Sequence, residues 1–234
     1  MSQRLSKRFF VTGTDTDVGK TFVTCAMLKH FERQGIKALG FKPISAGCEV
    51  DEDVLVNIDA QLIQANSNVQ APLNVINPIA FEPPIAPHIA AAKVGKRIDF
   101  TQLNSGFDKL QQYKADVYLV EGAGGWLLPI NETDTLNQWV EQQQLEVILV
   151  VGVKLGCLNH ALLTAQAIES QGLTLAGWVA NIVAPQTAYI EENIEHLKMV
   201  LGAPLLARVP YFADGDSFDF DKQTIDFSHH LHEQ

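Results

Sequence analysis

The sequence predicts an α/β fold, in which a mostly parallel, doubly wound sheet is flanked by helices. Two observations favour this fold. Short apolar segments rich in Val, Ile, Leu and Phe alternate along the chain with segments of helical periodicity. The apolar segments are nearly continuous, which is typical of strands covered on both faces, as in a parallel sheet. Right-handed crossovers would then place ligands beyond the carboxyl ends of the strands.

Strands and helices are expected in alternation from the N-terminus. The first helical pattern carries apolar residues at helical spacing and ends before Gly35, which suits a helix C-terminus. The Pro-rich piece from Asn77 to Ala91 is expected to be an ordered loop that leads into a short helix, because no change of composition follows it. The expected strands are Phe9 to Thr12, Ala38 to Phe41, Val117 to Val120, Val147 to Val151, Ala176 to Ile182 and Leu205 to Val209. The expected helices are Thr21 to Gln34, Ile58 to Ala65, Phe100 to Gln112, Thr135 to Gln143, Asn159 to Gln171 and Thr187 to Leu201.

The composition indicates a single domain over residues 1–234. With 47% hydrophobic residues in 234, the chain can bury one core. Its end, from about residue 212, is acidic and is expected to be solvated and mobile. The terminal stretch SHHLHEQ is interpreted as part of this end rather than as a metal site, because no carboxylate or Cys stands at ligand spacing.

Charge, cysteine content and hydropathy exclude several classes of protein. The formal net charge of −10 argues against nucleic acid as a partner, since neutralising many phosphates requires clustered Lys and Arg. The three Cys residues contain no CxxC pair, which indicates a reducing compartment and neither a disulfide framework nor a zinc site. No signal peptide and no run of about 18 apolar residues is found, so we expect a cytoplasmic protein with no membrane partner.

A phosphate-binding loop is predicted between the first strand and the first helix. The stretch GTDTDVGKT follows a buried strand, opens a helix and ends in Gly19-Lys20-Thr21, although five residues rather than the usual four separate its glycines. Backbone N–H groups of such a loop hold phosphate oxygens, Lys20 would span the β and γ phosphates, and Thr21 would ligate Mg²⁺. The flanking strand and helix favour a fold like that of P-loop nucleoside triphosphate hydrolases over an ordinary glycine turn. The candidate nucleotide contacts are Gly13, Thr14, Asp15, Thr16, Asp17, Val18, Gly19, Lys20 and Thr21.

Two carboxylates are candidate ligands of the same Mg²⁺ ion, which prefers oxygen ligands. Glu121 follows the buried run that ends at Val120 and precedes a glycine-rich turn in which backbone can approach a ligand closely. Asp59 lies at the start of a predicted helix, where a charge that favours the helix N-terminus is an equally good interpretation.

Two further lysines are expected at the same edge of the sheet. Lys42 ends the second strand and Lys154 ends the fourth. A single lysine at a strand end is usually a solvated cap. Three lysines that converge with a phosphate loop instead indicate phosphoryl transfer, which is catalysed by positioned cations. After Lys154, the segment from Leu155 to Leu158 opens a helix whose free N–H groups suit a carboxylate.

At these residues the sequence resembles the dethiobiotin synthetase family. The resemblance is carried by GTDTDVGKT, GFKPISAG, EGAGGWLLPI, VILVVGVKLGCLNHALLTAQAI and AGWVAN, and extends through most of residues 8–210. It implies an ATP-dependent cyclo-ligase of biotin biosynthesis that forms C–N bonds. In that reaction 7,8-diaminononanoate and CO₂ form a carbamate, ATP phosphorylates the carbamate to a carbamic-phosphoric anhydride, and the second amine closes the ring of dethiobiotin.

The resemblance also implies roles for residues that match the family's motifs. Lys20, Lys42 and Thr16 would be catalytic, with Lys42 approaching the carbamate and the γ phosphate. Thr21, Asp59 and Glu121 would hold Mg²⁺. Asn181 would hydrogen-bond adenine, while Pro210 and Tyr211 would line its other side. The family works as a homodimer whose helix start at Gly156 to Asn159 holds the substrate carboxylate across the subunit boundary. The candidate substrate contacts are Lys42, Ser45, Lys154, Leu155, Gly156, Cys157, Leu158 and Asn159.

Two positions depart from the family pattern. Where relatives commonly carry Ser or Thr before the glycine of the second motif, this chain has Ala46, with Ser45 one place earlier. A hydroxyl contact to substrate or carbamate is therefore lost or shifted. Asp17 stands where Glu also occurs, which changes the reach of the side chain without changing its charge.

Three other classes of protein were weighed. A deviant Walker ATPase switch of the partitioning or positioning type carries an extra lysine near the start of its loop, where this chain has Thr14 and Thr16. A cobalamin-synthesis amidotransferase needs a glutaminase domain, for which 234 residues leave no room. A non-catalytic nucleotide sensor would leave Lys42 without a purpose.

Overall fold

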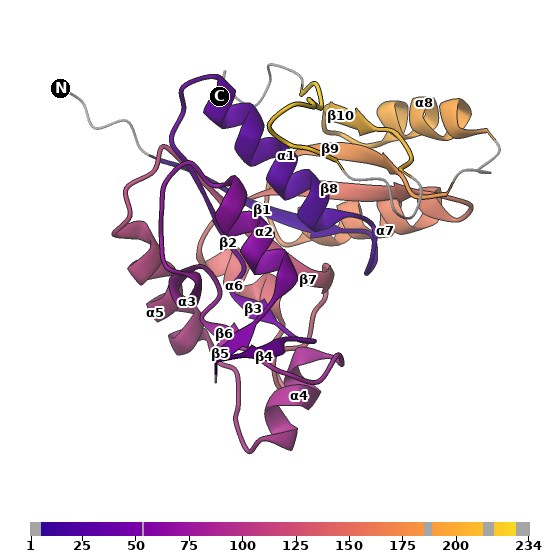
Figure 1. The fold of residues 1–234 in the computed structure, drawn as a ribbon. Helices are drawn as coiled ribbons and strands as arrows, with labels where there is room; N and C mark the ends of the chain where they lie inside the picture. Colours follow the sequence, from indigo (N-terminus) through magenta and orange to yellow (C-terminus); the bar gives the residue numbers. More distant parts are fainter. Residues whose placement is uncertain (1–5, 53, 185–188, 213–217, 228–234) are drawn as a thin grey trace.

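The fold is built around one parallel sheet with helices on both sides (Figure 1). The computed structural model describes residues 6–52, 54–184, 189–212 and 218–227. In this part of the chain six strands form the sheet, in the order β10-β9-β8-β1-β7-β2, and every neighbouring pair is parallel. The strands are β1 (Lys7–Gly13), β2 (Ala38–Phe41), β7 (Val117–Gly125), β8 (Glu146–Val153), β9 (Leu175–Ile182) and β10 (Leu205–Val209).

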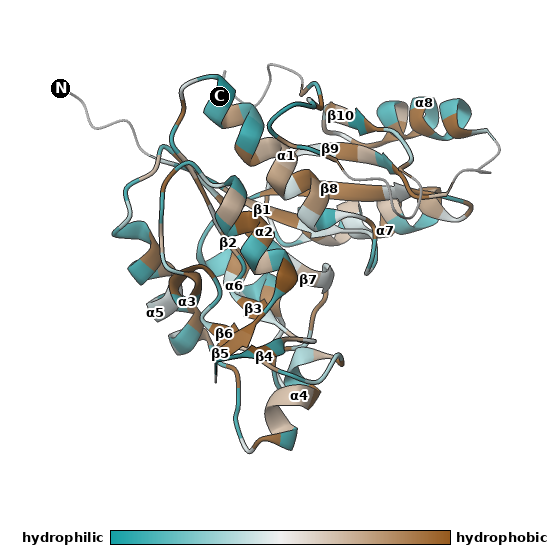
Figure 2. Ribbon diagram, in the orientation of Figure 1, coloured by the Kyte–Doolittle hydropathy of each residue, from teal (hydrophilic) through white to brown (hydrophobic). Residues whose placement is uncertain are grey.

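The strands are mostly apolar and buried, as is typical of parallel strands covered on both faces. Figure 2 shows hydrophobic residues concentrated on the sheet and hydrophilic ones on the outer faces of the helices. Helices α1 and α2 lie in front of the sheet in Figure 1, and α6 and α7 lie behind it. The longer helices are α1 (Lys20–Arg33), α2 (Ile58–Asn66), α5 (Phe100–Gln111), α6 (Leu136–Gln142), α7 (Cys157–Ser170) and α8 (Ile190–Val200).

The predicted fold class is confirmed, and the predicted elements differ from the structure mainly at their ends. The helix expected from Asn159 begins two residues earlier, after Gly156, which takes the left-handed conformation with φ 94°. The helix expected from Thr187 begins in the described part of the chain at Ile190, and its first expected residues lie outside the described residues. The short helix expected near the end of the Pro-rich piece is α4 (Pro87–Lys93).

Several short elements between β2 and α5 were not predicted. They are the parallel pair β3 (Ile44–Ser45) and β6 (Ile79–Ala80), the antiparallel pair β4 (Glu49–Asp51) and β5 (Val54–Val56), and α3 (Leu73–Ile76). Figure 1 shows both small sheets beneath the main one, next to α4. They carry the chain from the second strand around the edge of the site described below.

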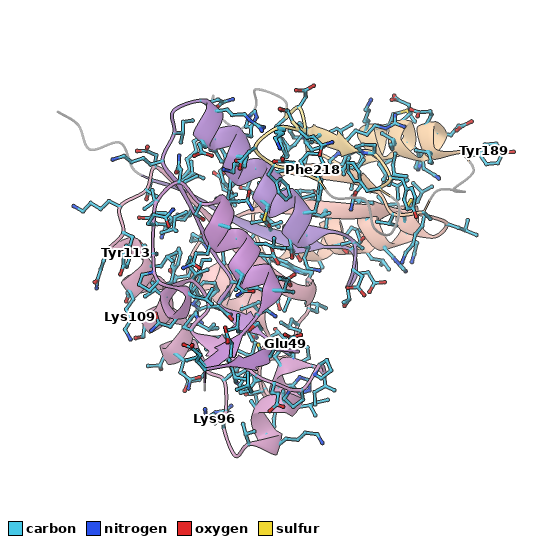
Figure 3. All side chains as sticks on the ribbon, viewed as in Figure 1. Glu49, Lys96, Lys109, Tyr113, Tyr189 and Phe218 are labelled. Atoms are coloured by element: carbon cyan, nitrogen blue, oxygen red, sulfur yellow. The ribbon has the colours of Figure 1, made fainter. Side chains whose placement is uncertain are left out.

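Aromatic residues from the described segments near the C-terminus pack on α1. The ring of Phe22 contacts those of Phe212, Phe218 and Phe220, with centroid distances of 5.4, 4.9 and 5.3 Å, and Figure 3 labels Phe218 in this position. Arg33 Nη2 donates to the Phe220 carbonyl oxygen at 2.6 Å, and Phe227 is buried. Within the described segment 218–227, residues 221–224 are exposed, and the solvated, mobile end expected from about residue 212 stays a prediction. The stretch SHHLHEQ lies outside the described residues.

The described residues contain no helix that is both long and apolar enough to cross a membrane.

Candidate active site

A cavity of about 920 Å³ opens beyond the carboxyl ends of β1, β2 and β7, where the fold was expected to bind its ligands. Its walls come from the loop after β1, the turn after β2, the start of α2, the segment before α4 and the glycine-rich end of β7. The lining residues are Thr16, Asp17, Gly19, Lys20, Thr21, Lys42, Ser45, Ala46, Asn57, Asp59, Pro84, Ile85, Ala86, Pro87, Glu121, Gly122, Ala123, Gly124 and Leu128.

The phosphate loop depends on both of its glycines. Gly19 precedes α1 with φ 85°, and a Cβ there would lie 2.2 Å from Asn181 Nδ2. A Cβ on Gly13 would lie 2.5 Å from Val18 Cγ2, so the loop could not fold back over its own start. Asp17 also has a positive φ of 56°, which Asp and Asn tolerate better than most residues. The loop therefore has the shape that a phosphate cradle requires.

Lys20 lies in the loop with its ammonium group turned toward the backbone. Its Nζ donates to the Asp15 carbonyl oxygen at 3.0 Å, and the residue is buried. Burial lowers the pKa of Lys20, and the nearby charge of Lys42 lowers it further, while Glu121 and other carboxylates offset part of the effect. A polyphosphate in the cavity would favour the charged form of this lysine.

Lys42, Glu121, Asp59 and Thr21 form one network, although they come from four different elements. Lys42 Nζ lies 2.7 Å from Glu121 Oε1 and 3.0 Å from Asp59 Oδ2, and Thr21 Oγ1 donates to the same Glu121 oxygen at 2.8 Å. The side chain of Glu121 is fully buried and that of Lys42 is 5% exposed. Burial by itself lowers the pKa of Lys42, but the two carboxylates outweigh burial and raise it. Lys42 is therefore held in its charged form.

The oxygen atoms of this network fit Mg²⁺. Glu121 Oε2 is buried and has no hydrogen-bond partner, so this oxygen can still accept a bond from a ligand in the cavity. Thr21 Oγ1 donates to Glu121 Oε1, and Asp59 Oδ2 lies 3.0 Å from Lys42 Nζ, which also contacts Glu121. Hard oxygen donors of this kind are what Mg²⁺ prefers. In the described part of the chain no three His, Cys, Asp or Glu residues are grouped to hold a metal by themselves. Phosphate oxygens and waters would have to complete the coordination of Mg²⁺, as is usual at nucleotide sites.

The structure brings most of the predicted catalytic and metal-binding residues into this one cavity. Thr16, Lys20 and Lys42 line it together with the metal candidates Thr21, Asp59 and Glu121. Ser45 also lines it, and Ala46 stands beside it as the sequence suggested.

Other predicted contacts lie outside the lining of this cavity. Lys154 Nζ lies 3.8 Å from Asp15 Oδ2 at the edge of the phosphate loop, and Leu155 is 98% exposed. Asn181 lies behind the loop and donates through Nδ2 to the Val18 carbonyl oxygen at 2.8 Å. The remaining such residues are Gly13, Thr14, Asp15, Val18, Gly156, Cys157, Leu158, Asn159, Pro210 and Tyr211, whose roles stay predictions.

Several lining residues were missed from the sequence. Asn57 caps α2 by accepting a hydrogen bond from the Ala60 N–H at 3.2 Å. An Asn ahead of an apolar helical pattern is a helix start signal, and it stands two residues before Asp59, so this residue could have been found. Pro84, Ile85 and Pro87 form a wall without any motif of their own.

Comparison with known proteins identifies the family. A family model described as an AAA domain matches residues 7–217. The ATP-dependent dethiobiotin synthetase of Pseudoalteromonas translucida is 51% identical over 205 residues, which cover 88% of this chain and 90% of that protein. An ATP-dependent dethiobiotin synthetase of Escherichia coli K12 is 48% identical over 210 residues, which cover 90% and 93%. The chain belongs to the dethiobiotin synthetase family.

Solved structures with low identity support the fold of this dethiobiotin synthetase family member and nothing more. The signal recognition particle receptor FtsY from Elizabethkingia anophelis in complex with GDP has a TM-score of 0.52 at 14% identity. The match covers 98% of this chain and 62% of that receptor, so the chain spans less than two thirds of its length. The MinC:MinD cell division protein complex of Aquifex aeolicus gives 0.51 at 16% identity, over 88% of this chain and 81% of that one. The predicted P-loop fold is therefore confirmed, and so is the resemblance noted in the sequence.

Proposed function

We propose that the chain is an ATP- and Mg²⁺-dependent dethiobiotin synthase that acts on 7,8-diaminononanoate and CO₂. The observation that carries the proposal is the juxtaposition of Lys20 and Thr21 of the phosphate loop with the Lys42, Asp59 and Glu121 cluster in a single cavity. Relatives that are about half identical over most of their length are ATP-dependent dethiobiotin synthetases, which supports the same activity. Because the reaction consumes ATP, we place it in the cytoplasm.

The reaction has three bond-forming steps. One amine of the substrate attacks CO₂, which forms an N–C bond and, after loss of a proton, a carbamate. A carbamate oxygen then attacks the γ phosphorus of ATP, and ADP leaves. In the resulting carbamic-phosphoric anhydride the second amine attacks the carbonyl carbon, phosphate leaves, and loss of a proton completes the cyclic urea.

The residues of the cavity suit the charges that these steps develop. Lys20 and Lys42 both line the cavity; in the proposed complex Lys20 would contact the phosphates, and Lys42 would contact the carbamate oxygen and the γ phosphate. Two positioned ammonium groups favour a transition state in which negative charge spreads over the phosphoryl oxygens. Mg²⁺, when bound at Thr21, Asp59 and Glu121, would neutralise phosphate charge. Apolar wall residues such as Ile85 and Leu128 limit the access of water to the carbamate and the anhydride.

Nucleotide choice and the substrate carboxylate are assigned to residues outside this cavity. We infer that Asn181 contacts adenine, with Pro210 and Tyr211 on the other side of the base. We also infer a homodimer, in which the start of α7 at Gly156 holds the substrate carboxylate across the subunit boundary.

The deciding experiment measures ADP formed by the purified protein with Mg-ATP and bicarbonate, with and without the diamine, together with mass spectrometry of the product. We expect ADP only in the presence of the diamine, and a cyclic urea product in equal amount. Lys42→Ala should abolish both, whereas Lys93→Ala, a change on α4 away from the cavity lining, should leave both unchanged. ADP formation without the diamine would contradict the proposal and favour the deviant Walker ATPase switch.

A further inference from the structure

Lys42 is held through its backbone as well as through its side chain. Its N–H donates to the Ile76 carbonyl oxygen at 2.8 Å, and its own carbonyl oxygen accepts from Asn77 Nδ2 at 2.7 Å. Both polar groups of this peptide segment are therefore bound by two consecutive residues at the end of α3.

The hydrogen bonds of Asn77 have only one possible direction. A carbonyl oxygen can only accept, so the Asn77 amide must turn Nδ2 toward Lys42 and Oδ1 toward Ser45. Ser45 Oγ lies 2.7 Å from Oδ1 and must donate to it. Cys48 Sγ lies 3.2 Å from the same hydroxyl oxygen, and because the Ser45 hydrogen is already used, the Cys48 thiol must donate to Ser45 Oγ. As a result the Ser45 hydroxyl has no hydrogen left for a ligand and can only accept from one.

The segment that carries Asn77 is itself firmly packed. The Asn77 N–H donates to the Leu73 carbonyl oxygen at 2.7 Å, and Asn77 is only 7% exposed. Pro78 packs against Gly106 of α5 so closely that a Cβ there would lie 2.9 Å from Pro78 Cγ. Beyond Pro78, strands β3 and β6 continue the pairing of the two segments. The two hydrogen bonds that Ile76 and Asn77 make to the Lys42 backbone thus come from a segment packed on the core and not from a mobile surface loop.

We propose that Asn77 is a positioning residue for the reaction: it fixes Lys42 relative to Glu121 and turns Ser45 into a hydrogen-bond acceptor at the cavity wall. The consequence for the reaction rests on the proposed function. An acceptor at Ser45 suits the N–H groups of an amine substrate and is unsuited to the oxygens of a carbamate or phosphate. The Lys42 ammonium, in turn, can stay within hydrogen-bond distance of Glu121 Oε1 only if the Lys42 backbone is fixed.

The kinetic test compares Asn77→Ala with Asn131→Ala. Asn131 is a matched control, since it is 6% exposed and also donates to a backbone carbonyl, that of Ile98 at 2.8 Å, far from the cavity lining. Both variants should lose stability. Only Asn77→Ala should lower kcat, by about 10- to 100-fold, because misplaced catalytic groups cost this much. Its KM for ATP should stay within about twofold of the wild type, since the phosphate loop is untouched. Loss of stability in both variants with kcat unchanged in both would overturn the proposal.

Asn77→Asp provides a second variant that keeps the shape of the side chain. An ionised carboxyl cannot donate to the Lys42 carbonyl oxygen, whereas a protonated one can. The kcat of this variant, divided by that of the wild type, should therefore rise as the pH falls. A ratio that does not change with pH would mean that the donor to Lys42 is irrelevant to turnover.

The position of Lys42 can be tested without relying on the activity. In crystal structures of Asn77→Ala and of the wild type, the distance from Lys42 Nζ to Glu121 Oε1 should lengthen in the variant from 2.7 Å to beyond hydrogen-bond range. An unchanged distance would refute the positioning role even if the wild type forms dethiobiotin. If the wild type formed no cyclic urea but the distance lengthened in Asn77→Ala, the proposed function would be wrong and the positioning of Lys42 by Asn77 would still be supported.

Discussion

Removal of the Lys42 ammonium should destabilise the folded protein far more than removal of a surface lysine. In Lys42→Met the stem is kept and the charge is lost, which leaves Glu121 buried with one oxygen already unpartnered. A pair of charges about 3 Å apart interacts by roughly 5 kcal/mol at an effective dielectric constant near 20. Breaking a buried pair by removing one partner costs about 3 to 5 kcal/mol. Asp59 contributes less, because its side chain is 38% exposed.

Lys29→Met is the matched control for this variant. Lys29 also contacts two carboxylates at 2.8 Å, Glu32 and Asp221, but both partners are solvent-exposed, at 41% and 79%. Exposed pairs of this kind contribute about 0.2 to 1 kcal/mol each. Urea unfolding at pH 7 without metal or nucleotide should therefore separate the two variants by at least about 1 kcal/mol, because the two exposed pairs of Lys29 together contribute at most about 2 kcal/mol. A difference below 1 kcal/mol would refute the view that Lys42 neutralises a buried carboxylate.

The same variants report on the metal site. Without the ammonium of Lys42, Glu121 and Asp59 lose the cation that contacts both of them. Mg²⁺ alone should then stabilise Lys42→Met more than it stabilises the wild type or Lys29→Met, because a ligand that binds only the native state adds to its stability. Equal Mg²⁺ effects in all three proteins would remove the metal assignment from these residues.

Three further changes test the nucleotide and substrate contacts. Because burial lowers the pKa of Lys20, ATP affinity measured by calorimetry should fall with rising pH already below the ordinary lysine value of 10.5, whereas Lys20→Ala should bind ATP weakly at every pH. A wild-type ATP affinity that stays constant up to pH 10.5 would contradict the assignment of Lys20 to the phosphates. Asn181→Ala should narrow the preference for ATP over GTP in competition assays, and an unchanged preference would remove the adenine contact. Ala46→Ser adds a hydroxyl to the cavity wall and should change the KM for the diamine about three- to tenfold, while the KM for ATP and the unfolding midpoint stay constant. No change in the KM for the diamine would show that position 46 does not contact it.

The parts of the fold that could be predicted are those whose signal is local. The buried strands are long enough to show their apolar character, and the phosphate loop is contiguous from Gly13 to Thr21. The pair β3 and β6 has only two residues in each strand, too few for any periodicity. The packing of residues 218–227 on α1 was hidden by an acidic composition, although Phe218 and Phe220 carried an aromatic signal.

The candidate site could be predicted only as far as sheet geometry allowed. Parallel strands place their carboxyl ends at one edge, which brings Lys42 and Glu121 together even though 79 positions separate them. The same reasoning does not decide whether Asp59 is a metal ligand, since a carboxylate at a helix start is explained equally well by the helix dipole. Asn77 could not have been found, because its role depends on two hydrogen bonds across the chain and on no pattern around it.

The nature of the site also bears on the choice between a ligase and a nucleotide switch, which share this fold. Switch ATPases of the partitioning type carry an extra lysine in the first half of the loop, where Thr14 here accepts from the Gly152 N–H at 3.4 Å and Thr16 faces the cavity. In this chain the proposed second cation is Lys42, which is buried against Glu121. With Lys42 in this role, the chain itself would supply the positive charge that phosphoryl transfer needs, and turnover would not have to wait for a lysine from a partner. A site arranged in this way suits chemistry on a bound acceptor better than a dimer-gated switch, and fold similarity by itself could not have made that distinction.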